Sequence, residues 1–249
     1  MARPNSIDQD LFERGVLVRL AGVDSGYATA ANVLQHLEFE ARTGEVALVT
    51  GPAAAGKTTF VHLLRLALPP RSGRASILGA DAGRISGVTR ARLKRRIGYV
   101  AENPVFVEQW SAFENIALPL QLSGRRPREF AEDVRELVDF VGLGGAADLP
   151  VEHLSGAERR RAAIARALAT KPALILADDP TGGMSPSDGR RTIRLLAEMR
   201  RVGAGVIITS QDETLADAGP NIQHWRLERG RLRPADPATT EPEPEGALE

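Results

Sequence analysis

The stretch that decides the fold is Gly51-Pro52-Ala53-Ala54-Ala55-Gly56-Lys57-Thr58-Thr59. It has the pattern G-x-x-x-x-G-K-[ST] of the phosphate-binding loop. Before it, residues 46–50 are an apolar run that predicts a buried strand, and after it residues 59–68 have helical spacing up to Pro69-Pro70. A small-residue turn from a strand into a helix N-terminus presents N–H groups and a positive helix end to an anion. The motif therefore lies in the context that its chemistry requires.

The loop predicts which residues bind nucleotide. Its small residues let the backbone wrap the α- and β-phosphates, Lys57 reaches the β- and γ-phosphates, and the Thr58 hydroxyl ligates Mg²⁺. The alternative, a structural turn with an incidental lysine, is disfavoured because motif and context agree. The residues expected to bind ATP here are Gly51, Pro52, Ala53, Ala54, Ala55, Gly56, Lys57, Thr58 and Thr59.

Composition bounds the class of protein. The chain has 249 residues, 43% hydrophobic and 26% charged, which is ordinary for a soluble globular protein. Lysine plus arginine and aspartate plus glutamate number 32 each, and a zero net charge argues against a nucleic-acid partner. The absence of cysteine excludes disulfides, thiolate zinc sites and iron–sulfur clusters. No signal peptide or run of ~18 apolar residues is seen. We therefore expect a cytoplasmic protein whose membrane role, if any, comes through a partner.

Hydrophobic patterning predicts an α/β fold with a parallel sheet. Residues 173–177 and 205–209 are apolar runs typical of strands buried on both faces, and a helix between them makes a β-α-β unit. Residues 1–15 are expected to be a loose arm, and the Pro-, Glu- and Thr-rich residues 233–249 a disordered tail. Further strands are expected at residues 16–20, 33–39, 75–79 (an edge strand) and 97–100, and further helices at 90–96 (a basic surface helix), 111–122, 128–141, 155–170 and 186–201.

Two carboxylates end the expected strand at 173–177. Buried carboxylates cost free energy unless they lie beside a cation or metal. Asp178 is thus the candidate that holds Mg²⁺, and Asp179 the candidate that faces the attacking water. The alternative is an acidic strand-to-turn junction without function, which the phosphate loop upstream in the same chain disfavours.

The segment Leu154-Ser155-Gly156-Ala157-Glu158 precedes the strongest helix. Ser155 and Glu158 have capping-box spacing, which would serve helix stability alone. The same capped N-terminus with small residues is also an anion site.

Taken together, these motifs resemble the ABC-type ATPases over residues 16 to about 232. The resemblance implies a P-loop NTPase fold with a mostly parallel sheet core, an antiparallel β subdomain and a helical subdomain at about 103–170. It implies that Tyr27 stacks on adenine, and that Ser155 and Gly156 contact the γ-phosphate held by the opposite subunit of a head-to-tail homodimer. ATP and Mg²⁺ are the implied ligands. Pairing with another ABC subunit stays open.

Several positions depart from the family pattern. Glu102 stands where the Q-loop glutamine links Mg²⁺ to the membrane partner, so it is a candidate catalytic and metal-binding residue. Asp179 replaces the catalytic glutamate, and Gln211 replaces the H-loop histidine. Ala157 replaces the second signature glycine and Ser185 the D-loop aspartate. The phosphate-binding residues are kept while the hydrolytic ones are altered, so slow hydrolysis is expected.

Within the family, residues 111–120 (Ser-Ala-Phe-Glu-Asn-Ile-Ala-Leu-Pro-Leu) resemble the cell-division group FtsE. That resemblance implies an integral membrane partner of FtsX type, which would hold the protein on the inner face of the cell membrane. Lipoprotein-release and macrolide-export ATPases share much of the pattern and are the alternative, as is an ATP-binding scaffold nearly silent in hydrolysis. Coiled-coil or zinc insertions typical of DNA-repair relatives are lacking. The apolar residues Val105, Phe106, Trp110 and Phe113 are expected to dock the partner, unless they pack into the helical subdomain.

Overall fold

The central sheet has six strands in the order β10-β9-β3-β8-β7-β6 in the computed structural model, which describes residues 10, 12–28 and 33–235. Neighbouring strands run parallel except β9 and β10, which are antiparallel. This confirms the predicted α/β fold with a mostly parallel sheet. The strands are β3 (Val46–Thr50), β6 (Ile97–Val100), β7 (Leu174–Asp178), β8 (Gly205–Ser210), β9 (Ile222–Glu228) and β10 (Arg231–Pro234).

Strands β3, β7 and β8 are buried along their whole length, as the apolar runs predicted. Successive side chains of a strand point to opposite faces, so each strand supplies two cores. Val46 and Leu48 of β3 pack with the helices on one face, whereas Ala47 and Val49 pack toward the second sheet.

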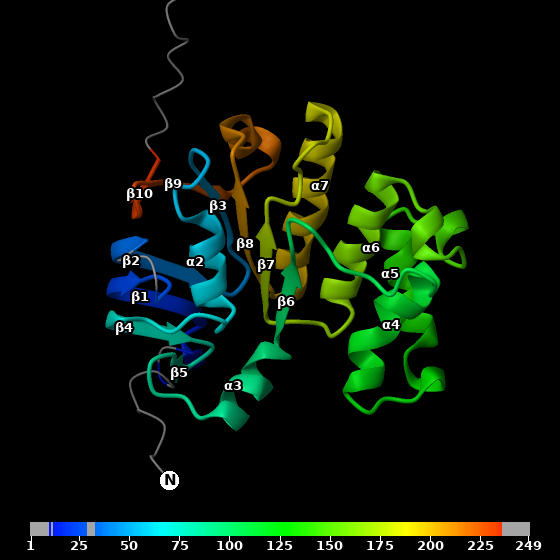
Figure 1. Cartoon of the computed structure of the whole chain (residues 1–249), viewed down its shortest axis with the longest axis horizontal. Helices are drawn as coiled ribbons and strands as arrows, with labels where there is room; N and C mark the ends of the chain where they lie inside the picture. The colour runs from blue at the N-terminus through cyan, green and yellow to red at the C-terminus, as the bar shows by residue number, and fades with distance from the viewer. Residues whose placement is uncertain (1–9, 11, 29–32, 236–249) are drawn as a thin grey trace, which may run out of the picture.

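The second sheet is antiparallel, in the order β2-β1-β4-β5, and helix α2 (Lys57–Leu64) lies between the two sheets (Figure 1). Phe60 of α2 is fully buried and its ring meets that of Phe39 edge to face, with centroids 5.4 Å apart. This packing fixes the helix that follows the phosphate loop. The strands are β1 (Val16–Ser25), β2 (Leu34–Arg42), β4 (Ser72–Ile77) and β5 (Ala80–Asp81).

A helical block stands beside β6 and β7, at the right of Figure 1. It holds α4 (Ala112–Leu122), α5 (Ala131–Phe140) and α6 (Gly156–Leu168), with short 3-10 turns at Pro127–Glu129, Gly144–Ala146 and Val151–His153. Outside this block lie α3 (Gly87–Lys94), α7 (Pro186–Glu198) and 3-10 turns at Met199–Val202 and Glu213–Ala218. Across the residues described, none of these helices is long and apolar enough to span a membrane.

Most expected elements differ from the structure only near their ends, as at residues 128–141, where a 3-10 turn at Pro127–Glu129 precedes α5 (Ala131–Phe140), and two differ further. The helix expected over residues 59–68 ends at Leu64, because Leu66 adopts a left-handed φ of 59° and the N–H groups of Ala67 and Leu68 turn back to the carbonyl of His62. The strand expected at residues 75–79 is β4, which lies between β1 and β5 and so is not an edge strand.

The expected ends of the domain also need adjustment. Phe12, in the arm expected to be loose, packs against the core beneath the guanidinium of Arg96, 5.1 Å from its ring centre. At the other end β10 runs to Pro234, past the expected boundary at 232. Residues 1–9 and 11 of the arm and 236–249 of the tail lie outside the described residues.

We predict that Gly98→Ala destabilises the contact between β6 and α6. A Cβ at Gly98 would lie 2.4 Å from the carbonyl oxygen of Ala167 and 2.9 Å from Cγ of Pro172, so the backbone must shift. We expect a loss of about 1–3 kcal/mol in the free energy of unfolding, measured by urea denaturation. Gly87→Ala is the control, because nothing lies within 4 Å of its added Cβ. Equal stability of the two variants would contradict the prediction.

Candidate functional site

The loop from β3 to α2 is held by glycines at both ends. A Cβ at Gly51 would lie 2.1 Å from the carbonyl oxygen of Leu227 in β9, so only glycine fits between β3 and β9. Gly56 caps α2 with a φ of 106°, in the region that favours glycine. The turn thus aims the N-terminus of α2, which begins at Lys57, at the carboxyl edge of the sheet.

Lys57 lies within the loop rather than in solvent. Its Nζ donates to the carbonyl oxygens of Gly51 and Pro52, both at 2.7 Å, and the residue is 8% exposed. Burial lowers the pKa of Lys57, while the carboxylates of Asp179, Asp178 and Glu102 raise it. The ammonium group of Lys57 therefore places a positive charge close to three carboxylates.

Asp178 ends β7 and is 2% exposed. Its Oδ1 accepts from the hydroxyl of Thr209 at 2.8 Å and from that of Thr58 at 3.4 Å. Mg²⁺ in nucleotide sites binds one or two protein oxygens and takes its other ligands from phosphates and water. Thr58 and Asp178 fit that need, and no group of three acidic, histidine or cysteine residues offers a stronger metal site within the described part of the chain.

Asp179 follows with a left-handed φ of 42°, which non-glycine residues seldom adopt. Its N–H donates to the carbonyl of Thr209 at 3.1 Å. Burial raises the pKa of the Asp179 carboxyl, and the nearby cations Lys57 and Arg160 oppose that rise. The backbone at this turn is thus held in a strained form that aims a carboxyl group into the site.

These groups meet in one pocket at the carboxyl edge of the parallel strands, where open α/β sheets bind ligands. It brings together most of the predicted residues: Ala53, Ala54, Gly56, Lys57, Thr58, Thr59, Glu102, Asp178, Asp179 and Gln211, with Val33 as an addition. Glu102 comes from the segment after β6 and Gln211 from the loop after β8. Four separate stretches of the chain therefore converge on the end of α2.

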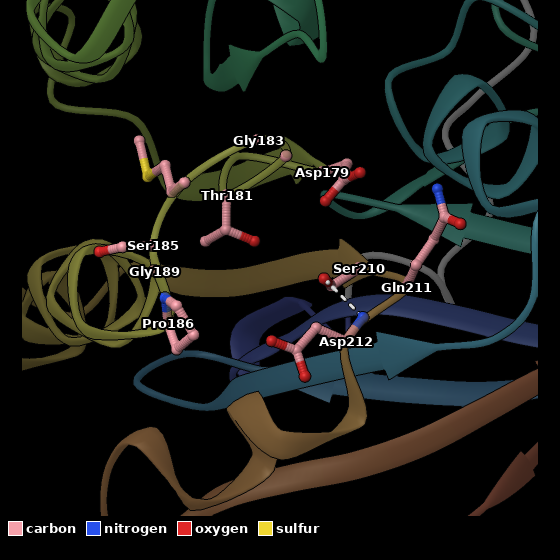
Figure 2. Close-up of a pocket in the computed structure, with 11 residues that line it drawn as sticks. Asp179, Thr181, Gly183, Ser185, Pro186, Gly189, Ser210, Gln211 and Asp212 are labelled. Carbon is pink, nitrogen blue, oxygen red and sulfur yellow. Dashed lines mark hydrogen bonds between the residues drawn. The ribbon is translucent and has the colours of Figure 1, made fainter.

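A second hollow adjoins this pocket and shares Asp179 and Gln211 with it. Figure 2 shows Asp179 on the turn after β7, Gln211 on the loop after β8, and Ser185 on the other side of the hollow. Ser185 caps α7 by accepting from the N–H of Asp188 at 3.2 Å. The loop after β8 is held by a bond from the N–H of Asp212 to the Ser210 hydroxyl, 3.1 Å (Figure 2).

The remaining predicted residues lie elsewhere. Ser155 caps α6 with Glu158 in a capping box, as its spacing predicted, and neither Ser155 nor Gly156 lines the pocket. Tyr27 is 40% exposed, outside the pocket, and its hydroxyl lies 3.0 Å from Nδ1 of His62 in α2. The other three loop residues, Gly51, Pro52 and Ala55, do not line the pocket. They shape the loop through backbone contacts, since the carbonyls of Gly51 and Pro52 accept from Lys57 and the N–H of Ala55 donates to the carbonyl of Pro52.

Sequence reasoning missed two residues that shape the site. Thr209 is fully buried and binds Asp178 through its hydroxyl. The signal for it was a polar residue at the end of an apolar strand. Arg160 of α6 reaches the carbonyls of Glu102 and Asp179. Nothing in the run Arg159-Arg160-Arg161 marked it, because the local sequence does not say which arginine faces the sheet.

Comparisons with known proteins agree with this geometry. Residues 34–182 match the ABC transporter family. The lipoprotein-releasing system ATP-binding protein LolD of Colwellia psychrerythraea is 34% identical over 204 residues, 81% of this chain and 78% of its own length. The cell division ATP-binding protein FtsE of Mycobacterium tuberculosis is 31% identical over 204 residues, 82% of this chain and 89% of its own. A dimeric bacterial ABC transporter cassette matches with a TM-score of 0.77 at 25% identity, covering 86% of this chain and 96% of that one.

We predict that Lys57→Ala weakens ATP binding. The substitution removes the ammonium group at the predicted β/γ-phosphate position, so the phosphates would lose the one buried cation of the loop and would face Asp178 and Asp179. We expect a loss of roughly 3 kcal/mol or more, about a hundredfold in affinity, measured by titration calorimetry with MgATP. Lys94→Ala, on the exposed face of α3, is the control. Affinity equal to that of the unaltered protein would refute the role of Lys57.

Proposed function

Because the chain belongs to the ABC transporter family of ATPases, we propose that it is the ATP-binding subunit of a membrane complex and drives that complex by binding MgATP. The observation that carries the proposal is the convergence of Lys57, Thr58 and Asp178 in one pocket at the N-terminus of α2. A helix N-terminus with a buried lysine binds polyphosphate, and paired hydroxyl and carboxylate oxygens bind its Mg²⁺.

The proposed roles follow from the positions. Backbone N–H groups of residues 51–59 and Nζ of Lys57 bind the phosphates, while Thr58 and Asp178 hold Mg²⁺. Glu102 contributes a carboxylate on the side of the pocket nearer the helical block. Asp179 orients the attacking water, and Gln211 donates its amide to the γ-phosphate. Tyr27, at the far end of α2 beside His62, stacks on the adenine.

A second copy of the chain completes the site in this proposal. Ser155 and Gly156, the signature residues, sit on the helical block and do not line the pocket of their own chain. A head-to-tail homodimer would bring the capped N-terminus of α6 to the opposite γ-phosphate. The dimeric cassette that this fold matches supports the arrangement.

The membrane partner that we favour is an integral protein of FtsX type, in a complex that acts in cell division. The segment at 111–120 supports this, as does the FtsE of Mycobacterium tuberculosis among the relatives. LolD proteins at 34% identity support the alternative, a lipoprotein-release complex. Co-expression with each type of membrane subunit, followed by purification in detergent, separates the two. Either complex would hold the chain on the cytoplasmic face of the membrane.

The apolar segment proposed to dock the partner is smaller than expected. Phe106 is 7% exposed, and the guanidinium groups of Arg159 and Arg166 lie 5.4 and 4.4 Å from its ring centre. Phe113 packs against the core of the helical block. Val105 is 82% and Trp110 38% exposed. The docking role therefore rests on Val105 and Trp110, because the two phenylalanines serve the fold.

We predict that Val105→Asp prevents the partner from binding. A carboxylate at an apolar interface loses hydration without gaining a hydrogen bond, so we expect at least a tenfold drop in the amount of partner that co-purifies. Val88→Asp is a matched control, because Val88 is also 82% exposed and lies on α3. The docking surface is wrong if both variants fold and retain the partner equally.

We predict that hydrolysis is slow and that Asp179→Glu accelerates it. An aspartate carboxyl lies ~1.5 Å short of the position that glutamate reaches, and a misplacement of ~1 Å can cost about 10²-fold in rate. Gln211→His should add to the gain, since a protonated histidine carries a charge that an amide lacks. Phosphate release measures the rates, with Asp139→Glu, at an exposed position of α5, as the control. Turnover of ~1 s⁻¹ or faster by the unaltered protein would remove the basis of the prediction.

A further inference from the structure

Arg160, in the first half of α6, joins three separate segments of the chain. Its Nη1 donates to the carbonyl oxygen of Glu102 at 2.9 Å and lies 3.4 Å from that of Asp179. Its Nη2 donates to the carbonyl of Gly182 at 3.1 Å. One guanidinium therefore links the helical block, the segment after β6 and the turn after β7.

We propose that Arg160 is a positioning residue of the ATPase site, which transmits movement of the helical block to the turn that carries Asp179. The proposal rests on the function proposed above. It adds that the nucleotide pocket and the partner-docking segment respond to each other through this side chain. Arg160 acts through Asp179 and Glu102 rather than by touching the nucleotide.

The backbone of Asp179 shows why such a contact is needed. Its left-handed φ of 42° is unfavourable for a residue with a side chain, so it persists only where the surroundings hold it. From one side the carbonyl of Thr209 accepts from the Asp179 N–H, and on the other side the Asp179 carbonyl faces Arg160. The same carbonyl also accepts from the N–H of Gly182 at 3.3 Å, and Nη2 of Arg160 holds the carbonyl of Gly182 in turn. Arg160 therefore contacts the turn that sets the direction of the Asp179 carboxyl at two points.

A guanidinium suits this place better than an ammonium would. Its planar fork has five N–H donors in fixed directions, whereas a lysine offers three donors around a single point. The carbonyls of Asp179 and Gly182 both belong to the turn after β7, and that of Glu102 belongs to the segment across from it. Arg160 can thus hold both segments at a fixed spacing.

Two neighbouring arginines tie the docking segment to the same helix. Arg159 makes a bidentate pair with Glu108, both distances 2.7 Å. Arg166 donates to the carbonyl of Val105 at 2.7 Å. Segment 102–108 is therefore fastened to α6. Among the hydrogen bonds of the described residues, Arg160 is the one α6 side chain that also reaches the turn at 179–182. Loss of Arg160 would leave the docking segment and the pocket each intact but would remove the contact between α6 and the turn that carries Asp179.

The test compares Arg160→Gln and Arg160→Lys with the unaltered protein and with Arg92→Gln, an exposed arginine of α3, as control. We expect Arg160→Gln to bind MgATP within about twofold of the unaltered affinity by calorimetry, because the P-loop is untouched, while its kcat falls at least tenfold. Arg160→Lys should recover part of kcat. A Trp225→Phe background leaves Trp110 as the only tryptophan. In that background MgATP should change Trp110 fluorescence, and Arg160→Gln should abolish the change.

The outcomes distinguish failure of the role of Arg160 from failure of the proposed ATPase function. If the unaltered protein does not bind MgATP, the proposed function fails and this inference fails with it. If it binds and hydrolyses ATP, and folded Arg160→Gln keeps both kcat and the Trp110 response, the inference alone is wrong. A parallel loss of affinity, kcat and melting temperature, with no recovery in Arg160→Lys, would show a structural role and would also overturn it.

Discussion

Burial of β3, β7 and β8 on both faces is the constraint on which the rest of this structure depends. A strand inside a parallel sheet is covered on both faces, so its polar side chains are confined to its ends. Because the strands run in the same direction, their carboxyl ends meet at one edge, and Thr50, Asp178 and Ser210 all end there. The gathering of polar groups at that edge thus follows from the common direction of the strands, and the nucleotide site makes use of it.

The charges at this edge stabilise one another only as a set. Lys57 and Asp178 are each almost fully buried, and an isolated buried charge costs several kcal/mol. Here the ammonium group has two carbonyl partners, and the carboxylate has two hydroxyl neighbours. Such an arrangement favours binding of a ligand that carries both negative charge and a cation, because phosphate oxygens compensate Lys57 while Mg²⁺ compensates Asp178.

The sequence predicted the parts of the site whose cause is local. The loop at 51–59, the strand ending in Asp178 and the capping box at Ser155 each depend on a few neighbouring residues. Strand β9 was missed because Ile222–Glu228 has neither a continuous apolar run nor strict alternation, and its place is decided by pairing with β3, far away in the chain. The sequence left the choice between docking and burial of Phe106 open for a similar reason, since the arginines that lie over its ring come from α6. Fold class and phosphate site were therefore accessible from sequence, whereas long-range contacts such as those of Arg160 were not.

The close approach of Gly51 to Leu227 has a consequence for how the chain is made. A ribosome releases the N-terminal part of a protein first, and domains fold as their segments emerge. Yet β3, at residues 46–50, pairs with strands that begin only at residues 205 and 222. Through most of translation, the apolar segment that becomes β3 therefore lacks both strands with which it pairs. Chaperones bind apolar segments exposed in this way. The phosphate loop is therefore translated early but reaches its final packing late. A prematurely terminated chain that lacks β9 would lose the strand that packs against Gly51.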